Sequence, residues 1–343
     1  MVEALKQYFT PVWANDVCPK KAGVFLGNHP REIFRLGRIE EVRGSDVPAA
    51  VLSWASFPCQ DLSLAGAVNG IDSSRSGLVW EWLRAMDEMP RRPPILVAEN
   101  VAGLVSAAGG THYRALHCAL ASRGYRVGAV LLDSARWLPQ SRARVFVIAV
   151  PLSLRINDLT AGAPTWAHPP VVQRAAQGLD QWVWWDIPEP RVQRPSLLDL
   201  IDLDAPCDNP KSTSHNLALI PPKHRRRLRA SVAAGLLRVV PGYKRTRKGR
   251  QSLELRFDGI AGCLRTPEGG SSRQLLVLAS NGQLRTRLLT VREAARLMGV
   301  RETYKIPGGY NDGYRAMGDA IAVPVVRHLG RTLLYPLALR VRE

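Results

Sequence analysis

The strongest constraint on the fold is a regular alternation of short apolar runs with helical stretches between Thr10 and Val150. Five apolar runs are expected to form strands, at residues 12–14, 47–53, 95–99, 126–132 and 144–150. Helical patterning occupies residues 19–28, 77–88 and 111–123, and Gly124 can end the last of these helices. This alternation favours an α/β domain, in which crossover helices connect the strands of a mostly parallel sheet.

Two further regions follow. Residues 151–285 are rich in Pro, Trp and Arg and have no clear period, so we expect a smaller, irregular or β-rich domain there. Residues 286–343 return to helical patterning, because Thr290 and Glu293 can form a capping box and residues 320–334 carry apolar side chains at helical spacing. We therefore predict a first domain at 1–150, a second at 151–285, and a segment at 286–343 that packs back on the first.

The chain is strongly basic. Its 343 residues include 47 Lys and Arg against 29 Asp and Glu, a net charge of +18, which favours a polyanionic partner such as nucleic acid. The positive charge is not confined to one tail, and it is densest at residues 224–227 and 244–250. An acidic protein partner or a disordered basic tail is the alternative.

Cysteine usage and hydropathy indicate the compartment. The five cysteines are an odd number without a Cys-x-x-Cys pair, which favours a reduced, intracellular chain. No apolar run reaches the length of about 18 residues that a membrane span needs, and the N-terminus lacks the pattern of a signal peptide. We expect a cytoplasmic protein with no membrane association and no metal site.

Three polar segments lie at the ends of predicted strands, where open α/β sheets place their functional sites. Cys59 follows the second strand and is a candidate nucleophile, although a cysteine in this position is more often a small buried hydrophobe. Glu99 ends the third strand, where its carboxyl group can act in chemistry or cap the next helix. Arg142 and Arg144 precede the fifth strand and project to one side, as a catalytic pair or as solvated charges.

These segments resemble the motifs of the cytosine carbon-5 DNA methyltransferases. The matches are Pro58-Cys59-Gln60, Glu99-Asn100-Val101, and Gln140, Arg142 and Arg144 in a Gln-x-Arg-x-Arg pattern. Residues 287–299 resemble the late helix motif of the family, and residues 317–324 resemble its closing Gly-Asn-Ala-Val-Pro motif, with Asp319 in place of Asn. The resemblance implies a Rossmann-like class I methyltransferase domain, S-adenosylmethionine as cofactor, and a target-recognition domain within the unmatched residues.

The resemblance also implies roles for the catalytic residues. Cys59 would add to carbon-6 of a cytosine flipped out of the duplex, which makes carbon-5 nucleophilic. Glu99 would hydrogen-bond ring nitrogen 3 and the exocyclic amine. Arg142 and Arg144 would lie by the base carbonyl and the Cys59 side chain, favouring the thiolate.

The cofactor site that the resemblance implies is incomplete. The corresponding positions are Asp16, Val17, Ile39, Pro58, Leu78, Asp319 and Ala320. The Gly-rich loop with which the family opens is absent, and Arg38 stands where the family has an Asp that contacts adenine. A start codon assigned too far downstream and a truly shortened protein both account for this. The alternative function is a DNA-binding protein that has lost catalysis; a tRNA methyltransferase on the same fold is less favoured, because those relatives have a shorter recognition region.

Double-stranded DNA is the partner that charge and resemblance both favour. The candidate DNA contacts are Gln60, Ser63, Arg225, Arg226, Arg227, Lys244, Arg245, Gly269 and Gly270. For the basic clusters, a solvated surface is the alternative interpretation. Trp182, Trp184 and Trp185 are interpreted as local core rather than as a platform for stacking bases. We expect a monomer, and a restriction endonuclease acting on the same site is a further candidate partner.

Overall fold

The computed structural model describes residues 1–57, 77–235, 238–265, 273–280 and 282–342. The strands are Ala14–Asp16 (β1), Phe34–Leu36 (β2), Leu52–Ser56 (β3), Ile95–Val101 (β4), Tyr125–Asp133 (β5), Ala143–Pro151 (β6), Val239–Arg247 (β7), Arg250–Leu255 (β8), Gln274–Ser280 (β9) and Gln283–Leu288 (β10). The helices are Val2–Leu5 (α1), Pro19–Leu26 (α2), Leu78–Glu88 (α4), Gly103–Ser106 (α5), Thr111–Ala121 (α6), Pro170–Ala176 (α7), Pro210–Ala218 (α8), Pro222–Ala233 (α9), Val291–Leu297 (α10), Tyr310–Asp319 (α11), Val323–Leu329 (α12) and Tyr335–Arg340 (α13).

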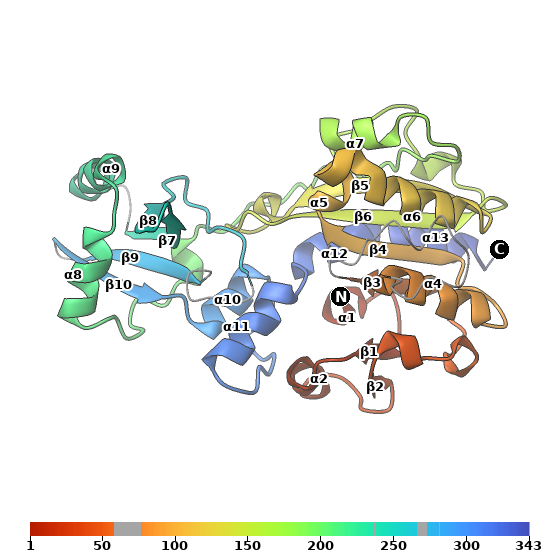
Figure 1. Cartoon of the computed structure of the whole chain (residues 1–343), viewed down its shortest axis with the longest axis horizontal. Coiled ribbons are helices and arrows are strands. Elements are labelled where there is room, and N and C mark those ends of the chain that lie inside the picture. Colours follow the sequence, from red (N-terminus) through yellow and green to blue (C-terminus); the bar gives the residue numbers. More distant parts are fainter. Residues whose placement is uncertain (58–76, 236–237, 266–272, 281, 343) are drawn as a thin grey trace.

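The larger unit is built on a four-stranded sheet in the order β3-β4-β6-β5. Successive residues at 95–98 of β4 and 145–150 of β6 are apolar and buried, so both faces of the sheet are covered (Figure 1). One face packs against α4, α5, α6 and α7, and the other against α1 and the C-terminal helices α12 and α13. Side chains of α12 and α13 thus share one core with β4 and β6.

The α/β class is confirmed, but the expectation of a mostly parallel sheet needs correction. β3 and β4 are parallel, whereas β6 is antiparallel to both β4 and β5. β5 and β6 are joined by a short connection, which permits only an antiparallel neighbour, while parallel strands need a crossover. β1 and β2 form a separate parallel pair.

Three of the predicted strands agree with the structure and two are displaced. The runs 95–99, 126–132 and 144–150 lie within β4, β5 and β6. The run expected at 47–53 is a strand only from Leu52, because residues 44–46 form a turn of 3₁₀ helix beneath α4. Residues 12–14 predict a strand that the structure places at 14–16, and the short strand β2 was not predicted.

The smaller unit is an antiparallel sheet in the order β10-β9-β7-β8. Helices α8 and α9 lie against one face through Ile220 and Leu228, and the opposite face joins the main core through Val239, Leu276 and Leu278. This unit is the expected β-rich region. The core of this sheet begins well after residue 151, however, because residues 152–201 pack with the larger unit.

The tryptophan group illustrates that packing. Trp182 pairs with Val127 of β5, and Trp185 is fully buried in the main core. The interpretation of these tryptophans as local core is confirmed for Trp185. In the described residues no helix is both long and apolar enough to cross a membrane.

Candidate active site

Glu99 lies near the carboxyl end of β4, where β3 also ends and β6 begins. Its register partners are Ser56 on β3 and Phe146 on β6. The side chain is 6% exposed, and Arg144 Nε lies 3.1 Å from Glu99 Oε1. The strands therefore bring two of the expected catalytic residues into contact.

The environment of Glu99 affects its protonation. Burial raises the pKa of the Glu99 carboxyl group, and the charge of Arg144 and a hydrogen bond from Ser56 offset only part of this effect. The carboxyl group can therefore carry a proton more readily than an exposed Glu, which allows it to donate a hydrogen bond as well as to accept one.

Asn100 joins this site to the segment that carries the proposed nucleophile. Its Nδ2 donates to the Phe57 carbonyl oxygen at 2.8 Å, and its Oδ1 accepts from the Val101 N–H. Asn100 is 3% exposed, so it is a buried amide with both ends bonded. The sequence motif contained Asn100, but no role was predicted for it. Its position next to Glu99 at the end of a strand could have indicated that it belongs to the site. Pro58, Cys59, Gln60 and Ser63 lie outside the described residues.

Arg142 is positioned differently from Arg144. Its guanidinium group donates to the carbonyl oxygens of Leu264, Gly318 and Ala320, at 2.9, 2.7 and 2.5 Å. A fourth contact reaches Cys263 Sγ at 3.3 Å. Burial lowers the pKa of Arg142, and the charge of Arg144 adds to the effect. The structure therefore places Arg142 among backbone carbonyl groups, whereas Arg144 faces the Glu99 carboxylate.

The expected cofactor residues are distributed over two parts of the larger unit. Asp16 ends β1, and its Oδ1 accepts from the Cys18 N–H at 2.8 Å. Val17 is 60% exposed, and Leu36, the register partner of Asp16 on β2, is 55% exposed. Leu36 was not predicted from the sequence as a cofactor residue. The feature that could have indicated it is a large apolar side chain at the end of a short strand. A carboxylate between exposed apolar groups at the ends of parallel strands is suited to an adenosine. The carboxylate can accept hydrogen bonds from the ribose hydroxyls, and the apolar side chains can pack against the flat adenine ring.

The other expected cofactor residues are less exposed or already engaged. Ile39 begins a turn of 3₁₀ helix and is half-buried, as is Leu78 at the start of α4. Asp319 ends α11 and is paired with Lys21 Nζ at 2.8 Å, which ties α2 to the end of α11 beside Ala320. Arg38 pairs with Glu40 at 2.6 Å. Among the expected cofactor residues that the structure describes, Val17 is therefore the most exposed, whereas Asp319 is held in an ion pair.

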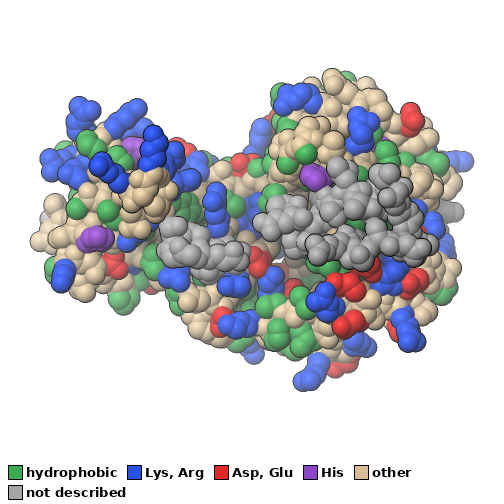
Figure 2. Space-filling model, in the orientation of Figure 1, with side chains coloured by type: hydrophobic (Ala, Val, Ile, Leu, Met, Phe, Trp, Pro, Cys, Tyr) green, Lys and Arg blue, Asp and Glu red, His purple; other side chains and the backbone are tan. Residues whose placement is uncertain are grey.

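The smaller unit carries the basic clusters. Figure 2 shows Lys and Arg side chains gathered over α9 and the strands β7 and β8. Arg225, Arg226 and Arg227 are all exposed; Arg225 also donates to the Ala218 and Ile220 carbonyl oxygens, and Arg227 stacks on the Phe257 ring. Two of the three expected contacts in α9 are therefore already engaged with the protein.

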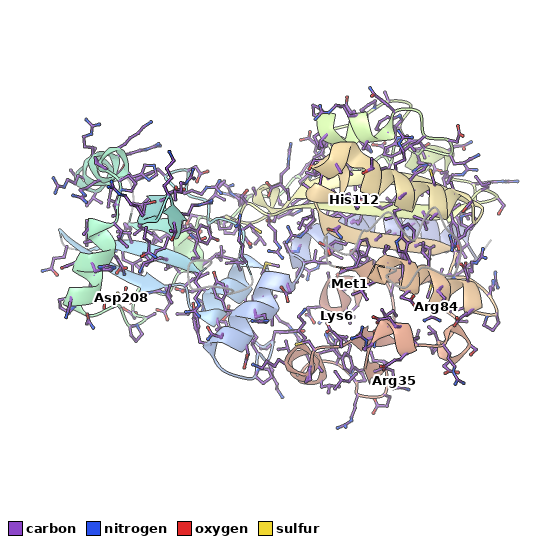
Figure 3. All side chains as sticks on the ribbon, in the orientation of Figure 1. Met1, Lys6, Arg35, Arg84, His112 and Asp208 are labelled. Atoms are coloured by element: carbon purple, nitrogen blue, oxygen red, sulfur yellow. The ribbon has the colours of Figure 1, made fainter. Side chains whose placement is uncertain are left out.

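Two hollows lie in different parts of the molecule. One, of about 520 Å³, lies between α8 and the sheet of the smaller unit. It is lined by Asp208, Lys211, Ser212, His215, Asn216, Lys244, Arg273, Leu275 and Leu288. Asp208, labelled in Figure 3, accepts from Asn216 Nδ2 and Thr286 Oγ1. The cationic side chains outnumber this one carboxylate, so the hollow favours an anion. Lys244 thus lines the hollow, while Arg245 pairs with Glu254 at 3.1 Å; Gly269 and Gly270 lie outside the described residues.

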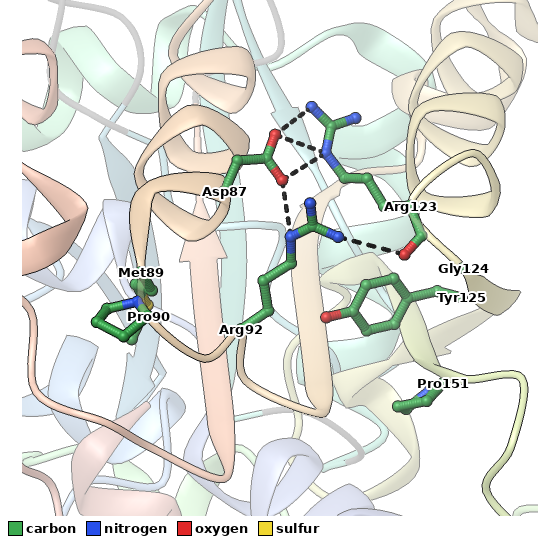
Figure 4. A pocket seen from close by; sticks show the side chains of 8 residues that line it. All are labelled: Asp87, Met89, Pro90, Arg92, Arg123, Gly124, Tyr125 and Pro151. Carbon is green, nitrogen blue, oxygen red and sulfur yellow. Dashed lines mark hydrogen bonds and ion pairs between the residues drawn. The ribbon is translucent and has the colours of Figure 1, made fainter.

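The second hollow, of about 410 Å³, lies at the edge where β4 and β5 begin, opposite Glu99. Asp87 accepts from both Arg92 and Arg123 there (Figure 4). These charges satisfy one another and show no catalytic arrangement. Within the described ranges, no group of His, Cys, Asp and Glu side chains could hold a metal ion.

The comparison with known proteins decides the family. A family model described as C-5 cytosine-specific DNA methylase matches residues 2–334. The chain belongs to this family. The resemblance seen in the sequence motifs is therefore confirmed, and the Glu99–Arg144 pair lies in a member of this family.

Individual relatives agree with this assignment. The chain is 28% identical over 170 residues to the type II methyltransferase M.Bsp6I of Bacillus sp. (strain RFL6), covering 44% of this chain and 53% of that protein. It is 22% identical over 295 residues to the type II methyltransferase M.HhaI of Haemophilus parahaemolyticus, covering 85% and 78%. The chain spans about half the length of the first curated relatives that it matches.

A solved structure supports the fold. The crystal structure of the S. pombe Dnmt2 methyltransferase aligns with a TM-score of 0.59 and 19% sequence identity, over 97% of this chain and 94% of that one. At this level of identity the likeness concerns the fold alone.

Proposed function

We propose that this protein is a site-specific DNA (cytosine-5-)-methyltransferase that uses S-adenosylmethionine. The observation that supports the proposal best is the buried Glu99–Arg144 pair, which Asn100 links to the end of the strand preceding Pro58-Cys59-Gln60. A carboxyl group with a raised pKa, held by an arginine at a strand end, suits a heterocyclic base that gains negative charge during reaction.

The proposed chemistry begins with the Cys59 thiolate. Its sulfur bonds to carbon-6 of the flipped cytosine, and the carbon-5/carbon-6 π electrons move onto carbon-5 and the ring. Glu99 hydrogen-bonds ring nitrogen 3 and the amine, which stabilises the added electron density. Arg144 holds Glu99 in place and lies by the base carbonyl. After carbon-5 is methylated, a base removes its proton, and the electron pair re-forms the double bond as the Cys59 thiolate leaves.

The cofactor supplies an electrophilic methyl group when it is bound. We assign its ribose hydroxyls to Asp16 and its adenine to the apolar surface of Val17, Leu36 and Ile39. Pro58, Leu78, Asp319 and Ala320 would complete the surroundings. Asp319 would lie there while paired with Lys21.

DNA would lie between the larger and smaller units, where Figure 2 shows the molecule hollowed. We propose that residues 1–150 and 286–343 hold the target cytosine and that residues 151–285 recognise the surrounding sequence. Lys244, Arg245 and Arg226 would contact phosphates, and Arg225 and Arg227 would shape α9 for this contact. Gln60, Ser63, Gly269 and Gly270 remain candidate DNA contacts. A monomer, a cytoplasmic location and a restriction endonuclease acting on the same site remain predictions.

A second function is favoured by one observation. Arg38 occupies the position of the adenine-contacting Asp and is paired with Glu40. A DNA-binding protein without cofactor affinity would have this arrangement. Cofactor binding therefore separates the two functions.

The test is methyl transfer from labelled S-adenosylmethionine to plasmid DNA. We expect the unmodified chain to label the DNA and Cys59→Ser to abolish labelling while binding DNA with unchanged affinity. Cys118→Ser, which replaces an exposed cysteine of α6, is the matched control and should keep full activity. Salt-sensitive DNA binding without labelling or cofactor binding would favour the second function. Labelling by Cys59→Ser at the unmodified rate would refute the covalent mechanism.

A further inference from the structure

Residues 261–264 connect the two units and are held from both sides. From the larger unit, the Pro139 carbonyl oxygen accepts from the Ala261 N–H at 2.8 Å, and the Ala261 carbonyl oxygen accepts from the Ser141 N–H at 2.9 Å. These reciprocal bonds form a short parallel bridge between residues 139–141 and Ala261. Residues 261–264, which we name the junction segment, therefore extend the β5–β6 connection of the larger unit.

The smaller unit holds the same segment. Tyr243 of β7 donates its hydroxyl proton to the Cys263 carbonyl oxygen at 2.7 Å. Gln274 of β9 accepts from the Gly262 N–H at 3.0 Å, and its own N–H donates to the Tyr314 hydroxyl oxygen at 2.8 Å. A Cβ at Gly262 would lie 2.4 Å from a ring carbon of Tyr243, so the two units fit closely here. The junction segment is therefore held by side chains of both β7 and β9.

Arg142 connects the junction segment to the catalytic strands. Its guanidinium group reaches the Leu264 carbonyl oxygen and the Cys263 sulfur on one side, and the Gly318 and Ala320 carbonyl oxygens at the end of α11 on the other. The side chain is 2% exposed. Two residues further along, Arg144 holds Glu99. The backbone between the two arginines is fixed, because the Arg142 N–H donates to Asp133 Oδ1 at 2.7 Å.

Gln140 reinforces this connection. Its Nε2 donates to the Leu297 carbonyl oxygen at 2.6 Å, at the end of α10, and its Oε1 accepts from the Leu264 N–H at 3.3 Å. Gln140 is completely buried. The Gln-x-Arg-x-Arg segment therefore directs Gln140 and Arg142 to the junction segment and directs Arg144 to Glu99.

We propose that Arg142 is a positioning residue that couples the docking of the smaller unit on DNA to the placement of the Glu99–Arg144 pair. This inference rests on the proposed function and differs from the role that the sequence resemblance implies, in which Arg142 contacts the base. Correct DNA contacts fix β7 and β9, which fix the junction segment, and Arg142 carries that position to the start of β6. Misplaced DNA leaves the Glu99–Arg144 pair out of position, so Arg142 contributes to the choice of site.

Arg142→Met, Arg142→Lys and Tyr243→Phe test the proposal. The sites that the unmodified chain methylates in plasmid DNA are first mapped by bisulfite sequencing, and initial rates at these sites and at all other cytosines are then compared. We expect Arg142→Met to lower the ratio of these rates about ten-fold, because several charge-assisted hydrogen bonds are lost. Arg142→Lys should restore part of the ratio. Tyr243→Phe, a mild change that preserves the ring, should also lower the ratio. This variant keeps the proposal testable if Arg142→Met does not fold.

Arg126→Met is the matched control. Arg126 lies on β5 and donates to the Leu152 carbonyl oxygen, away from the junction segment, so its loss should leave the ratio unchanged. An equal fall in rate at all cytosines after Arg142→Met would show that Arg142 acts on the base itself and would overturn the proposal. An unchanged ratio in both Arg142→Met and Tyr243→Phe would overturn it as well.

Hydrogen exchange separates failure of this proposal from failure of the proposed function. In the unmodified chain, plasmid DNA should slow amide exchange in β7, in residues 261–264 and at the end of β4. In Arg142→Met, protection of β7 should remain while protection at the end of β4 is lost. Retained protection at both places would refute coupling, even if the unmodified chain transferred no methyl group.

Discussion

Arg142 and Arg144 are two positions apart in the sequence but have different surroundings. Their spacing predicts that both project to one side of an extended segment, and the family resemblance implies that both lie by the reacting base. Arg144 does face Glu99, but Arg142 precedes β6 and turns towards the carbonyl groups of Leu264, Gly318 and Ala320. The sequence placed Glu99, Arg142 and Arg144 in one predicted site. The Glu99–Arg144 ion pair was decided by the tertiary structure, and so were the contacts of Arg142 with segments more than 100 residues away.

Glu99→Gln tests the residue scale. We expect the methylation rate to fall about 100-fold, because an amide stabilises charge on ring nitrogen 3 less well than a carboxyl group does. The fold should persist, because Gln has nearly the same shape and the Arg144 side chain, 14% exposed, keeps access to water. Single-turnover rates and thermal unfolding measure the two effects, with Glu32→Gln as an exposed control. An unchanged rate would reassign Glu99 to a structural role.

At the scale of elements, α10 shows how a short sequence pattern becomes a buried ion pair. Thr290 Oγ1 accepts from the Glu293 N–H, and Glu293 Oε2 accepts from the Thr290 N–H, so the expected capping box is confirmed. The pattern did not reveal that Glu293 is fully buried and bonded to Arg287 through both carboxylate oxygens. Burial alone would raise the pKa of Glu293, but hydrogen bonds from Arg287 and from backbone N–H groups lower it overall.

Glu293→Gln tests this element. Removing one charge leaves the buried Arg287 guanidinium without its partner, and we expect a loss of about 3 kcal/mol in the free energy of unfolding. Glu302→Gln, which breaks the exposed pair with Arg296, should cost less than about 1 kcal/mol and is the matched control. Urea unfolding followed by fluorescence measures both. Equal losses in the two variants would contradict the dominant role of the buried pair.

At the scale of the whole molecule, the positive charge is unevenly distributed. The smaller unit carries α9 and the hollow lined by Lys211, Lys244 and Arg273, whereas the hollow at the far edge of the larger sheet is occupied by the Asp87 ion pairs. Arg225 and Arg227 of α9 and Arg245 and Arg247 of β7 also contact groups of their own unit. Of the cationic side chains behind the net charge of +18, some form ion pairs within the protein and others are available to contact a polyanion.

Lys244→Gln tests this distribution. We expect weaker binding to duplex DNA of any sequence, and a slope of log affinity against log salt that is smaller by about 1, as for the loss of one phosphate contact. Arg91→Gln, at an exposed position of the larger unit beyond α4, should leave the slope unchanged. Fluorescence anisotropy between low and moderate salt measures both. Equal slopes in Lys244→Gln and the unmodified chain would remove Lys244 from the DNA surface.

The sequence by itself determined the α/β class, the buried strands β4, β5 and β6, the capping box and the family. These features depend on local periodicity, on side chains within one turn of a helix, or on short motifs, all of which are present in the linear order. Only the tertiary structure decided the antiparallel placement of β6, the burial of residues 152–201 against the larger unit, and the separate surroundings of Arg142 and Arg144. The physical reason is that strand neighbours and the partners of buried charges are chosen by packing between distant segments, which no local pattern records.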